Sequence, residues 1–371
     1  MKKIYLDNAA TTKASDRVIT EMINSMKNDF ANANSIHDFG NSVSKKIKEK
    51  KKIFEKILKV PSEDVYFTAG GTDSNNILIK GIAKAHKNGR IITTKIEHPS
   101  ILETTKSLEE EYEVIYLDVN EYGEVLESSL VEAMTDDTIL VSISYVNSEL
   151  GIIQDIKKLS ETVKRINKNT IFHTDFVQGL SHIDVDFSKL NVDAISMSSH
   201  KIHGPKGIGA LYLKKNTKFK NMVYGKSNDN ILVPRTLANE LIIGFLEAME
   251  EIDYANIKKV EKLKEYTLEK LKDIKDIRIN SKENASPYIL NIAFKNARGE
   301  AILNYLSSFD IYISTGSACS SRIKVSNVIS AINLSKEYID GVIRISFSKY
   351  NEKEEIDYFI EKLKEVLEMM V

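Results

Sequence analysis

The feature of this sequence that most restricts its fold is an alternation of strand-like and helix-like stretches between about residue 16 and residue 250. Most strand-like runs are separated by stretches with helical spacing of apolar residues, such as 43–58. The alternation predicts helices covering a mostly parallel, seven-stranded sheet, which binds ligands beyond the carboxyl ends of its strands. The expected strands are Val65–Thr68, Ile91–Thr94, Val114–Leu117, Ile139–Tyr145, Ile171–His173, Ala194–Met197 and Ala210–Leu213.

The pattern changes after about Phe245. A long charged helix is expected over 252–274, followed by strands at 288–294 and 342–347. The last helix is expected to begin near Asn351, with Glu354 completing a capping box. We therefore expect a large domain at 15–248, and a small α+β domain formed by 1–14 and 249–371, since 371 residues suit two domains.

Charge and cysteine content limit the partners and the compartment. The chain carries 52 basic and 53 acidic residues, so no overall field attracts nucleic acid or an anionic membrane. Its sequence shows neither a signal peptide nor an apolar run as long as a membrane span. The single cysteine, Cys319, excludes internal disulfides and fits a reducing compartment. We expect a cytoplasmic protein that binds neither nucleic acid nor membrane.

The stretch 196–212 carries the strongest chemical signal. A buried strand leads into Ser198, Ser199, His200 and Lys201, and a glycine-rich turn then starts a returning strand. A lysine desolvated at a strand tip loses its proton readily and forms Schiff bases with carbonyl cofactors. Hydroxyls and a histidine beside it suit a phosphate. The alternative is an exposed lysine next to a turn, which Ser-His-Lys alone does not exclude.

Two further strand ends carry groups that suit a flat, phosphorylated cofactor. Gly71 and Thr72 open a helix directly after a strand, and such an N-terminus favours an anion. Asp175 ends another strand, where a carboxylate can keep a pyridine nitrogen protonated and Gln178 is free to donate to a ring hydroxyl. An ordinary turn and a helix cap are the respective alternatives.

His98 and Asn147 follow two more strands at the same sheet edge. An imidazole there can stack on a flat cofactor and move protons, although a loop histidine is also common as a structural residue. The run 314–321 consists of small residues around Cys319. Its polar neighbours favour a reactive thiol over a buried small side chain.

Together these segments resemble the cysteine desulfurases, which are pyridoxal-phosphate enzymes of aminotransferase class V. The resemblance extends from Tyr5 to about Ile356 and is most specific around Cys319. It rests on YLDNAATT, FTAGGTDSNN, EHPSILE, VNSELGIIQDI, HTDFVQG, SSHKIHGPKGIGALY, STGSACSS and VIRISFSKYNEKEEID. It implies the aminotransferase-like fold of type I and a homodimer with its site between subunits. It further implies conversion of L-cysteine to L-alanine, with the sulfur held as an enzyme persulfide for an iron–sulfur scaffold or thiolation enzyme.

The resemblance also implies roles for single residues, and no metal. Lys201 would hold the cofactor covalently, Cys319 would accept the sulfur, and His98 would lie on the ring face and accept or relay a proton. Asp175 would face the ring nitrogen, Gln178 the ring hydroxyl and Asn147 the ring edge. The phosphate would be held by Gly71, Thr72, Ser198 and His200, with Ser199 in the same stretch and Thr236 from the other subunit. The substrate carboxylate would be bound by Arg344, with Asn8 beside it.

Two departures from the family pattern keep alternatives open. The segment YGKSNDNILVPRTLANE retains Thr236 but little of its usual surroundings, and Arg322 and Ile323 follow the serines after Cys319 in a shorter loop. A selenocysteine lyase or an aminotransferase is one alternative. A protein that binds pyridoxal phosphate without turnover is the other. Release of alanine from L-cysteine separates these interpretations.

Overall fold

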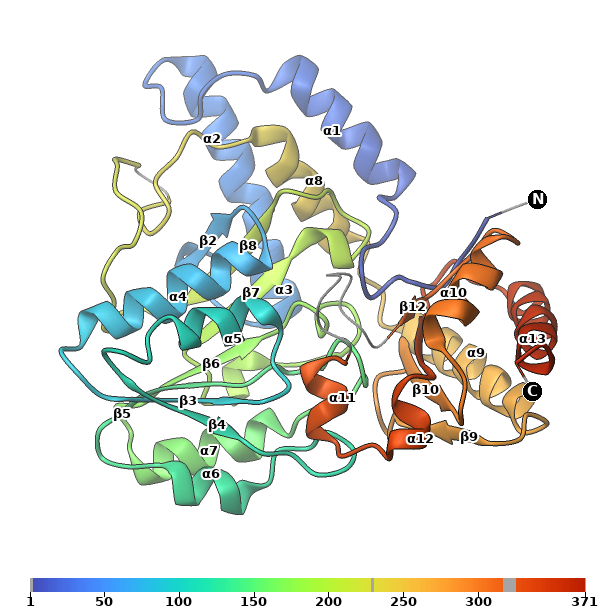
Figure 1. The fold of residues 1–371 in the computed structure, drawn as a ribbon. Helices are drawn as coiled ribbons and strands as arrows, with labels where there is room; N and C mark the ends of the chain where they lie inside the picture. The colour runs from blue at the N-terminus through green and yellow to red at the C-terminus, as the bar shows by residue number, and fades with distance from the viewer. Residues whose placement is uncertain (1–2, 228–229, 316–324, 371) are drawn as a thin grey trace.

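The computed structural model describes residues 3–227, 230–315 and 325–370 (Figure 1). Its main element is a seven-stranded sheet of order β2-β8-β7-β6-β5-β3-β4, in which only β8 runs antiparallel to its neighbours. The predicted mostly parallel sheet is thus confirmed. Its strands are β2 (Val65–Thr68), β3 (Arg90–Thr94), β4 (Glu113–Leu117), β5 (Thr138–Ser142), β6 (Ile171–Asp175), β7 (Ala194–Ser198) and β8 (Gly209–Leu213).

Both faces of this sheet are covered by apolar cores. Successive strand residues point to opposite sides of the sheet and so contribute to different cores. Ile91 and Leu140 belong to one apolar core, whereas the next residues, Ile92 and Val141, belong to the other. The helices of this region are α1 (Asp16–Asn28), α2 (Asp38–Lys51), α3 (Ile53–Leu58), α4 (Gly71–Ala85), α5 (Pro99–Lys106), α6 (Glu127–Ala133), α7 (Ile156–Ile166) and α8 (Asn239–Glu250). Short 3-10 turns occur at Ser62–Asp64, Phe187–Lys189 and Ser199–Lys201.

Two elements of this region differ from the sequence pattern. The expected helix 43–58 is divided at Lys52 into α2 and α3, and the short α3 buries Ile53, Phe54, Ile57 and Leu58. The expected strand 139–145 ends at Ser142. Beyond Ser142 the chain stays bonded to β6, since the Tyr145 N–H donates to Asp175 O at 2.9 Å, while the Ser144 N–H donates to both carboxylate oxygens of Glu97 at 3.1 Å.

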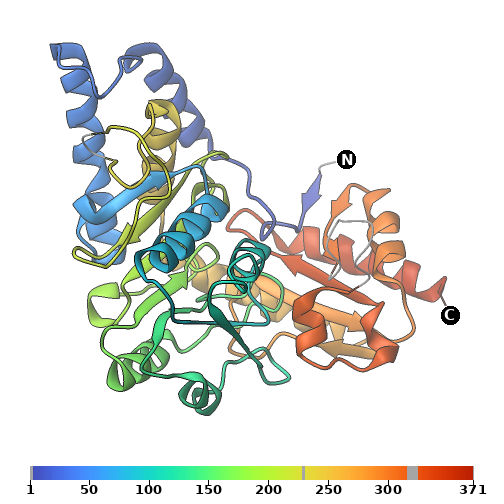
Figure 2. The same cartoon turned by 60° about the vertical axis from the view of Figure 1, so that its left-hand side comes forward.

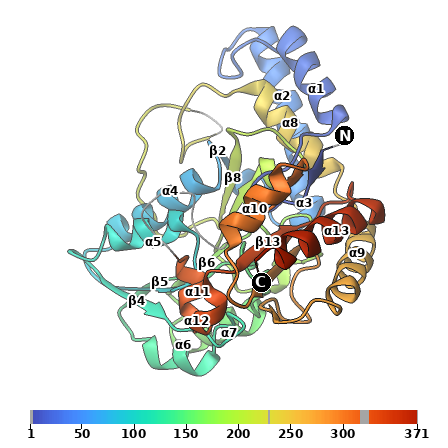
Figure 3. The same ribbon diagram turned by 45° about the vertical axis from the view of Figure 1, so that its right-hand side comes forward.

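The C-terminal part forms a second sheet of order β12-β13-β10-β9, with antiparallel pairing throughout. Its strands are β9 (Ile277–Ile279), β10 (Ile289–Phe294), β12 (Ser314–Thr315) and β13 (Val342–Ser346). The helices of this part are α9 (Ala255–Leu271), α10 (Gly299–Ser307), α11 (Asn327–Ala331), α12 (Lys336–Ile339) and α13 (Lys353–Glu368). Figures 2 and 3 show α9, α10 and α13 gathered around this sheet, away from α1 and α2.

The start of α13 differs from the expected capping box. Glu352, not Asn351, is the N-cap, and its N–H donates to Glu355 Oε2 at 3.3 Å. Asn351 lies outside the helix, because its Oδ1 accepts the Ser348 N–H at 2.8 Å. The predicted apolar face is confirmed, with Ile356, Phe359, Ile360, Leu363 and Val366 buried and Leu367 packed against the same core.

The N-terminal segment joins the C-terminal sheet region before the chain enters α1. β1 (Ile4–Tyr5) pairs in parallel with β11 (Ile311–Tyr312), and Asp7 bridges to Ser346. Leu6 and Ala9 pack in the C-terminal core. The domain division at residues 14/15 and 248/249 stays a prediction. Of the helices in the described ranges, none has the length and apolar character needed to cross a membrane.

Candidate active site

A cavity of about 390 Å³ lies at the carboxyl ends of β5, β6 and β7. Residues of the N-terminal segment and of β13 complete its wall. It therefore occupies the sheet edge at which a parallel sheet binds ligands. Most of the side chains predicted from the sequence line it, namely Gly71, Thr72, His98, Asn147, Asp175, Gln178, Ser198, His200, Lys201 and Arg344.

Lys201 lies in the 3-10 turn that follows β7. Its Nζ donates hydrogen bonds to the backbone oxygens of Ala9 at 2.6 Å and Ala10 at 2.8 Å. Burial, together with the nearby charge of Arg344, lowers the pKa of Lys201 to about 8, against the opposing effects of Asp7 and Asp175. A larger share of the amine is therefore neutral near pH 7 than for an exposed lysine, and a neutral amine is nucleophilic.

The N-terminal segment fixes the lysine turn from one side. The N–H and the hydroxyl of Thr12 both donate to the His200 carbonyl at 2.9 Å, and Thr12 Oγ1 accepts the His203 N–H at 2.7 Å. Gly204 closes the turn against Ser199, where a Cβ would lie 2.0 Å from Ser199 Oγ. Ser199 is fully buried there and does not line the cavity.

One end of the cavity suits an anion. Helix α4 begins at Gly71, and the first-turn N–H groups of a helix have no partner within it. A Cβ on Gly71 would lie 2.7 Å from Val177 Cγ2, so the close backbone approach requires glycine. The buried Ser198 Oγ lacks a hydrogen-bond partner among the described residues. Burial lowers the pKa of His200 to about 4, leaving a neutral imidazole. These groups fit a phosphate.

The centre of the cavity carries a buried carboxylate and an amide. Asp175 accepts the Val177 N–H at 2.9 Å and the Asn75 side-chain N–H at 2.8 Å. Gln178 Nε2 donates to Ala9 O at 2.9 Å, and its buried Oε1 has no partner within the described chain. Because buried polar atoms are normally hydrogen-bonded, Gln178 Oε1 and Ser198 Oγ indicate a polar ligand in this cavity. A phosphorylated pyridine with a ring hydroxyl fits these groups.

Asn147 has both ends of its amide occupied by backbone groups. Its Nδ2 donates to Ile96 O at 2.8 Å, while its Oδ1 accepts the N–H groups of Glu149 at 2.9 Å and Leu150 at 2.8 Å. The residue therefore holds the loop after β5 against the end of β3. Its place in the cavity wall agrees with a position at a ring edge.

Arg344 projects from β13 into the same cavity. Its Nη2 forms a 2.6 Å ion pair with Asp7 Oδ1, its Nη1 donates to Ser148 O at 3.0 Å, and its buried Nε lacks a partner among the described residues. Asp7 thus occupies the Nη2 group of the Arg344 guanidinium. Asp7 was not predicted as a partner of Arg344, although it adjoins Asn8 in the LDNAATT motif.

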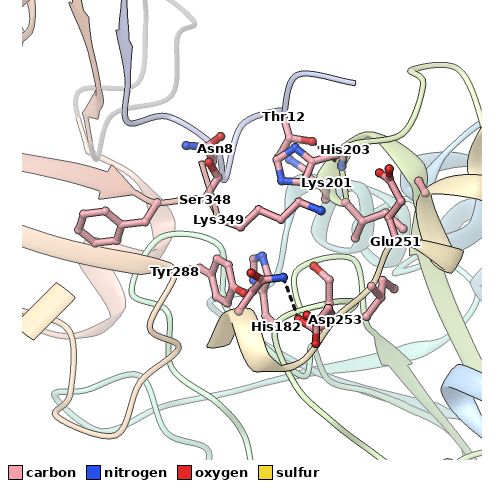
Figure 4. Close-up of a pocket in the computed structure, with 16 residues that line it drawn as sticks. Asn8, Thr12, His182, Lys201, His203, Glu251, Asp253, Tyr288, Ser348 and Lys349 are labelled. Atoms are coloured by element: carbon pink, nitrogen blue, oxygen red, sulfur yellow. Dashed lines mark hydrogen bonds between the residues drawn. The ribbon is translucent and has the colours of Figure 1, made fainter. Parts of the chain in front are cut away.

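Asn8 lies outside this cavity. Its Nδ2 donates to Ser346 O at 2.9 Å and to Tyr5 O at 3.1 Å, so the amide ties the N-terminal segment to β13. Figure 4 shows Asn8 at a second cavity of about 30 Å³, which Lys201 and the stacked pair His182 and Tyr288 also line. Asn8 as a substrate-binding residue stays a prediction.

Two further predicted residues are placed elsewhere. Thr236 precedes α8 and does not line the cavity of its own chain. Cys319 belongs to residues 316–324, which lie outside the described residues. The chain leads toward them from Ser314, which pairs with Arg344, and after them Ser326 Oγ donates to Glu149 Oε2 at 2.7 Å. One flanking segment thus pairs with Arg344, and the other contacts Glu149, next to the Ser148 that accepts from Arg344.

Sequence reasoning also missed Asn75 and Ser100, which line the cavity behind Asp175 and His98. Asn75 lies four residues after Gly71 on α4, which puts both residues on the same helix face. Ser100 lies two residues after His98 in the EHPS motif. Helical spacing was therefore the available signal for Asn75, while Ser100 became evident only through its hydrogen bonds.

A buried lysine at a strand tip, an aspartate and an anion-binding helix end together define a pyridoxal-phosphate enzyme of aminotransferase type. Residues 4–359 match the family model for aminotransferase class V, so the chain belongs to that family. Its cofactor is pyridoxal 5′-phosphate.

Individual relatives agree with this family. The chain is 38% identical to a protein named cysteine desulfurase IscS from Dictyoglomus turgidum, covering 100% of this chain and 95% of the relative. A protein of the same name from Methanosarcina thermophila is 36% identical, with 100% and 93% covered. A solved "NifS-like protein" superposes with a TM-score of 0.93 at 34% identity, covering 99% of this chain and 100% of the other. A structure described as "SspA in complex with cysteine" gives 0.83 at 31% identity, with 95% and 100% covered.

Proposed function

We propose that this protein is a cysteine desulfurase that converts L-cysteine to L-alanine and retains the sulfur. The observation that carries the proposal is the buried Lys201 amine, whose pKa is lowered to about 8, in one cavity with Asp175 and Arg344. These groups supply a nucleophilic amine, a carboxylate for a ring nitrogen and a cation for a substrate carboxylate. The names of the relatives, and the similar structure described as a complex with cysteine, support the choice of substrate.

The cavity residues divide into those that hold the cofactor and those that hold the substrate. Gly71, Thr72, Ser198 and His200 would bind the cofactor phosphate, and Asp175 would keep the ring nitrogen protonated. When bound, pyridoxal phosphate delocalises the negative charge that develops at the substrate Cα. Arg344 would bind the substrate carboxylate through its guanidinium, in exchange for its present contact with Asp7.

Lys201 would accept the proton that is removed from the substrate Cα. An amine with a pKa near 8 is partly neutral at physiological pH, and once free in the cavity it accepts the Cα proton. The carbonyls of Ala9 and Ala10 hold its Nζ at the cavity wall. The lysine therefore moves a proton between positions in the cavity without leaving it.

We assign the sulfur step to Cys319, from the sequence alone. The Cys319 thiolate attacks the substrate sulfur, the Cβ–S bond breaks and an S–S bond forms on the enzyme. The C–S electron pair stays on carbon, which takes a proton to become the methyl group of alanine. The outer sulfur then passes to an acceptor protein, an iron–sulfur scaffold or a thiolation enzyme. We also infer a cytoplasmic location, from the use of one cysteine.

The test is a comparison of Cys319→Ala with the neighbouring control Ser320→Ala. The Cys319 variant should bind cofactor and change its absorption spectrum with L-cysteine, yet release less than about 1% of the wild-type alanine, because nothing accepts the sulfur. The control should keep most of its turnover. Full alanine release by Cys319→Ala would rule out the persulfide route. Survival of selenocysteine turnover alone would favour a selenocysteine lyase.

We further propose a homodimer in which Thr236 reaches the partner's phosphate site. Helix α1 has one apolar face packed on α8 and a second, solvent-exposed one that carries Ile19, Ile23 and Met26. This exposed face continues in the α1–α2 loop to Phe30 and Ile36, which are 73% and 93% exposed. Helices α1 and α2 project from the rest of the molecule (Figure 2). The exposed apolar residues on α1 and on the α1–α2 loop therefore favour burial of this surface against a second copy of the protein.

A further inference from the structure

The strongest unassigned feature of the site is a chain of hydrogen bonds that ends on His98. Asn75 is fully buried on α4, and its Nδ2 donates to Asp175 Oδ2 at 2.8 Å and to Ser100 Oγ at 2.9 Å. Ser100 Oγ in turn lies 2.8 Å from His98 Nδ1. The chain thus links the carboxylate at the end of β6 to the imidazole at the start of α5.

The direction of each bond in this chain is determined. Asp175 Oδ2 contacts the Asn75 amide nitrogen, because the amide oxygen in its place would repel a carboxylate. Both amide hydrogens are therefore donated, and Ser100 Oγ accepts one of them. The Ser100 hydroxyl hydrogen is then free to be donated to His98 Nδ1.

A second donor acts on the same imidazole nitrogen. His98 is the N-cap of α5, and its Nδ1 accepts the Ser100 backbone N–H at 3.1 Å. A nitrogen that accepts from an N–H and a hydroxyl carries no proton of its own. The neutral ring therefore has its hydrogen on Nε2.

The surroundings keep this ring uncharged. Burial lowers the pKa of His98, Lys201 adds to the effect and Asp175 opposes it. The N-terminus of α5 also carries partial positive charge, which disfavours an imidazolium. The adjacent carboxylate of Glu97 accepts from Thr94 and Ser144, on the other side of the loop.

We propose that Asn75 and Ser100 are positioning residues that hold His98 as the uncharged Nε2–H tautomer, so that His98 presents an N–H to the cavity and leaves proton removal to Lys201. The inference deepens the proposed function, on which it rests for the identity of the reaction. It differs from the sequence-based expectation that His98 accepts or relays a proton, which stays a prediction. A neutral histidine at a helix N-terminus is a known way to supply an electrophilic N–H donor.

The first test is histidine ¹⁵N NMR on the cofactor-loaded protein, with the His98 signal assigned from His98→Gln. We expect an Nε2–H tautomer that stays neutral at pH 7. Ser100→Ala should raise the His98 titration midpoint by about one pH unit, because a donor to the neutral ring is lost. Ser100→Thr should restore the wild-type value. Ser107→Ala, whose hydroxyl donates to Thr104 O at the other end of α5, is the matched control and should not move it. A charged ring at pH 7, or a hydrogen on Nδ1, would overturn the proposal.

The second test separates a hydrogen-bond donor from a proton acceptor. Glutamine supplies an N–H group but cannot take up a proton in this pH range. His98→Gln should therefore keep kcat within about tenfold of wild type, whereas His98→Ala should lose on the order of a hundredfold or more. In the His98→Gln background, Ser100→Ala should change kcat by less than about twofold, since its effect acts through the imidazole. Equal loss in both His98 variants would assign His98 as a base. The NMR result does not depend on turnover. It therefore tests the tautomer of His98 separately from the proposed desulfurase activity.

Discussion

Burial is the dominant physical influence on the side chains of the candidate site. It lowers the pKa of Lys201 to about 8 and that of His200 to about 4, and it raises the pKa of Glu97 to about 7. Each shift favours the uncharged form, as desolvation requires. The site therefore holds a lysine able to act as a nucleophile and a neutral histidine beside the anion-binding helix end.

The first residue-scale prediction concerns the amine of Lys201. With a folded pKa near 8, about a tenth of the amine is neutral at pH 7, and this share rises steeply up to pH 9. Reconstitution of the apoprotein with pyridoxal phosphate should accelerate over this range and level off above it. Borohydride reduction followed by peptide mass mapping should place the cofactor on Lys201. An adduct on Lys206, or a rate that keeps rising to pH 10.5, would contradict the assignment.

The second residue-scale prediction concerns Asp175. Asp175→Asn removes the charge that keeps the cofactor nitrogen protonated, so the developing Cα charge loses its stabilisation. We expect cofactor to remain bound while kcat falls by a factor of about 10² or more. Asp73→Asn is a suitable control, because Asp73 pairs with Arg235 at the rim and not in the central cavity. Near-wild-type turnover in Asp175→Asn would mean that another group faces the nitrogen.

At the scale of elements, the N-terminus of α13 shows that tertiary hydrogen bonds determine which residue becomes the N-cap. Sequence spacing indicated Asn351 and Glu354, yet the helix begins one position later because Asn351 is engaged in the preceding turn. Glu355 accepts from the Glu352 N–H and from Asn351 Nδ2 at 2.9 Å. The Glu355 carboxylate therefore stabilises both the N-terminus of α13 and the turn that precedes it.

Glu355→Ala should accordingly lower the free energy of unfolding by about 1 kcal/mol, the usual effect of losing a cap. Glu354→Ala, at the exposed position that the sequence pattern indicated, should change it by less than about 0.5 kcal/mol. Urea unfolding followed by circular dichroism measures both. Equal effects of the two substitutions would show that charge near the helix end, and not the specific contact, is responsible.

At the scale of the whole molecule, the proposed homodimer makes a direct prediction. Phe30→Asp places a charge within the exposed apolar residues of the α1–α2 loop and should shift the protein toward monomer at micromolar concentration. Leu126→Asp, at a residue 47% exposed before α6, is the control and should leave the mass unchanged. Light scattering distinguishes the outcomes. An active wild-type monomer with bound cofactor would contradict the dimer.

Much of the fold and most of the cavity lining were predictable, because both depend on local patterns. Apolar runs determine the strands, and polar residues directly after them meet at one edge of a parallel sheet. Contacts between distant segments were not predictable. The Arg344–Asp7 ion pair joins residues 337 positions apart, and the Asp175–Asn75 bond joins residues 100 apart. Asn8 and Ser199 have suitable chemistry, but their contacts turn Asn8 toward β13 and bury Ser199 beneath the lysine turn.

The N-terminal segment that holds Lys201 and Arg344 also sets an order of events during synthesis. Residues 4–12 leave the ribosome early, yet β1 pairs with Ile311–Tyr312 and Asp7 contacts Arg344. Until β13 has been translated, the bridge from Asp7 to Ser346 is missing, and in the described chain Thr12 is left to hold the segment on the lysine turn. The nascent chain therefore completes its cofactor site only after nearly all of these 371 residues have been made, because Arg344 is part of the cavity wall.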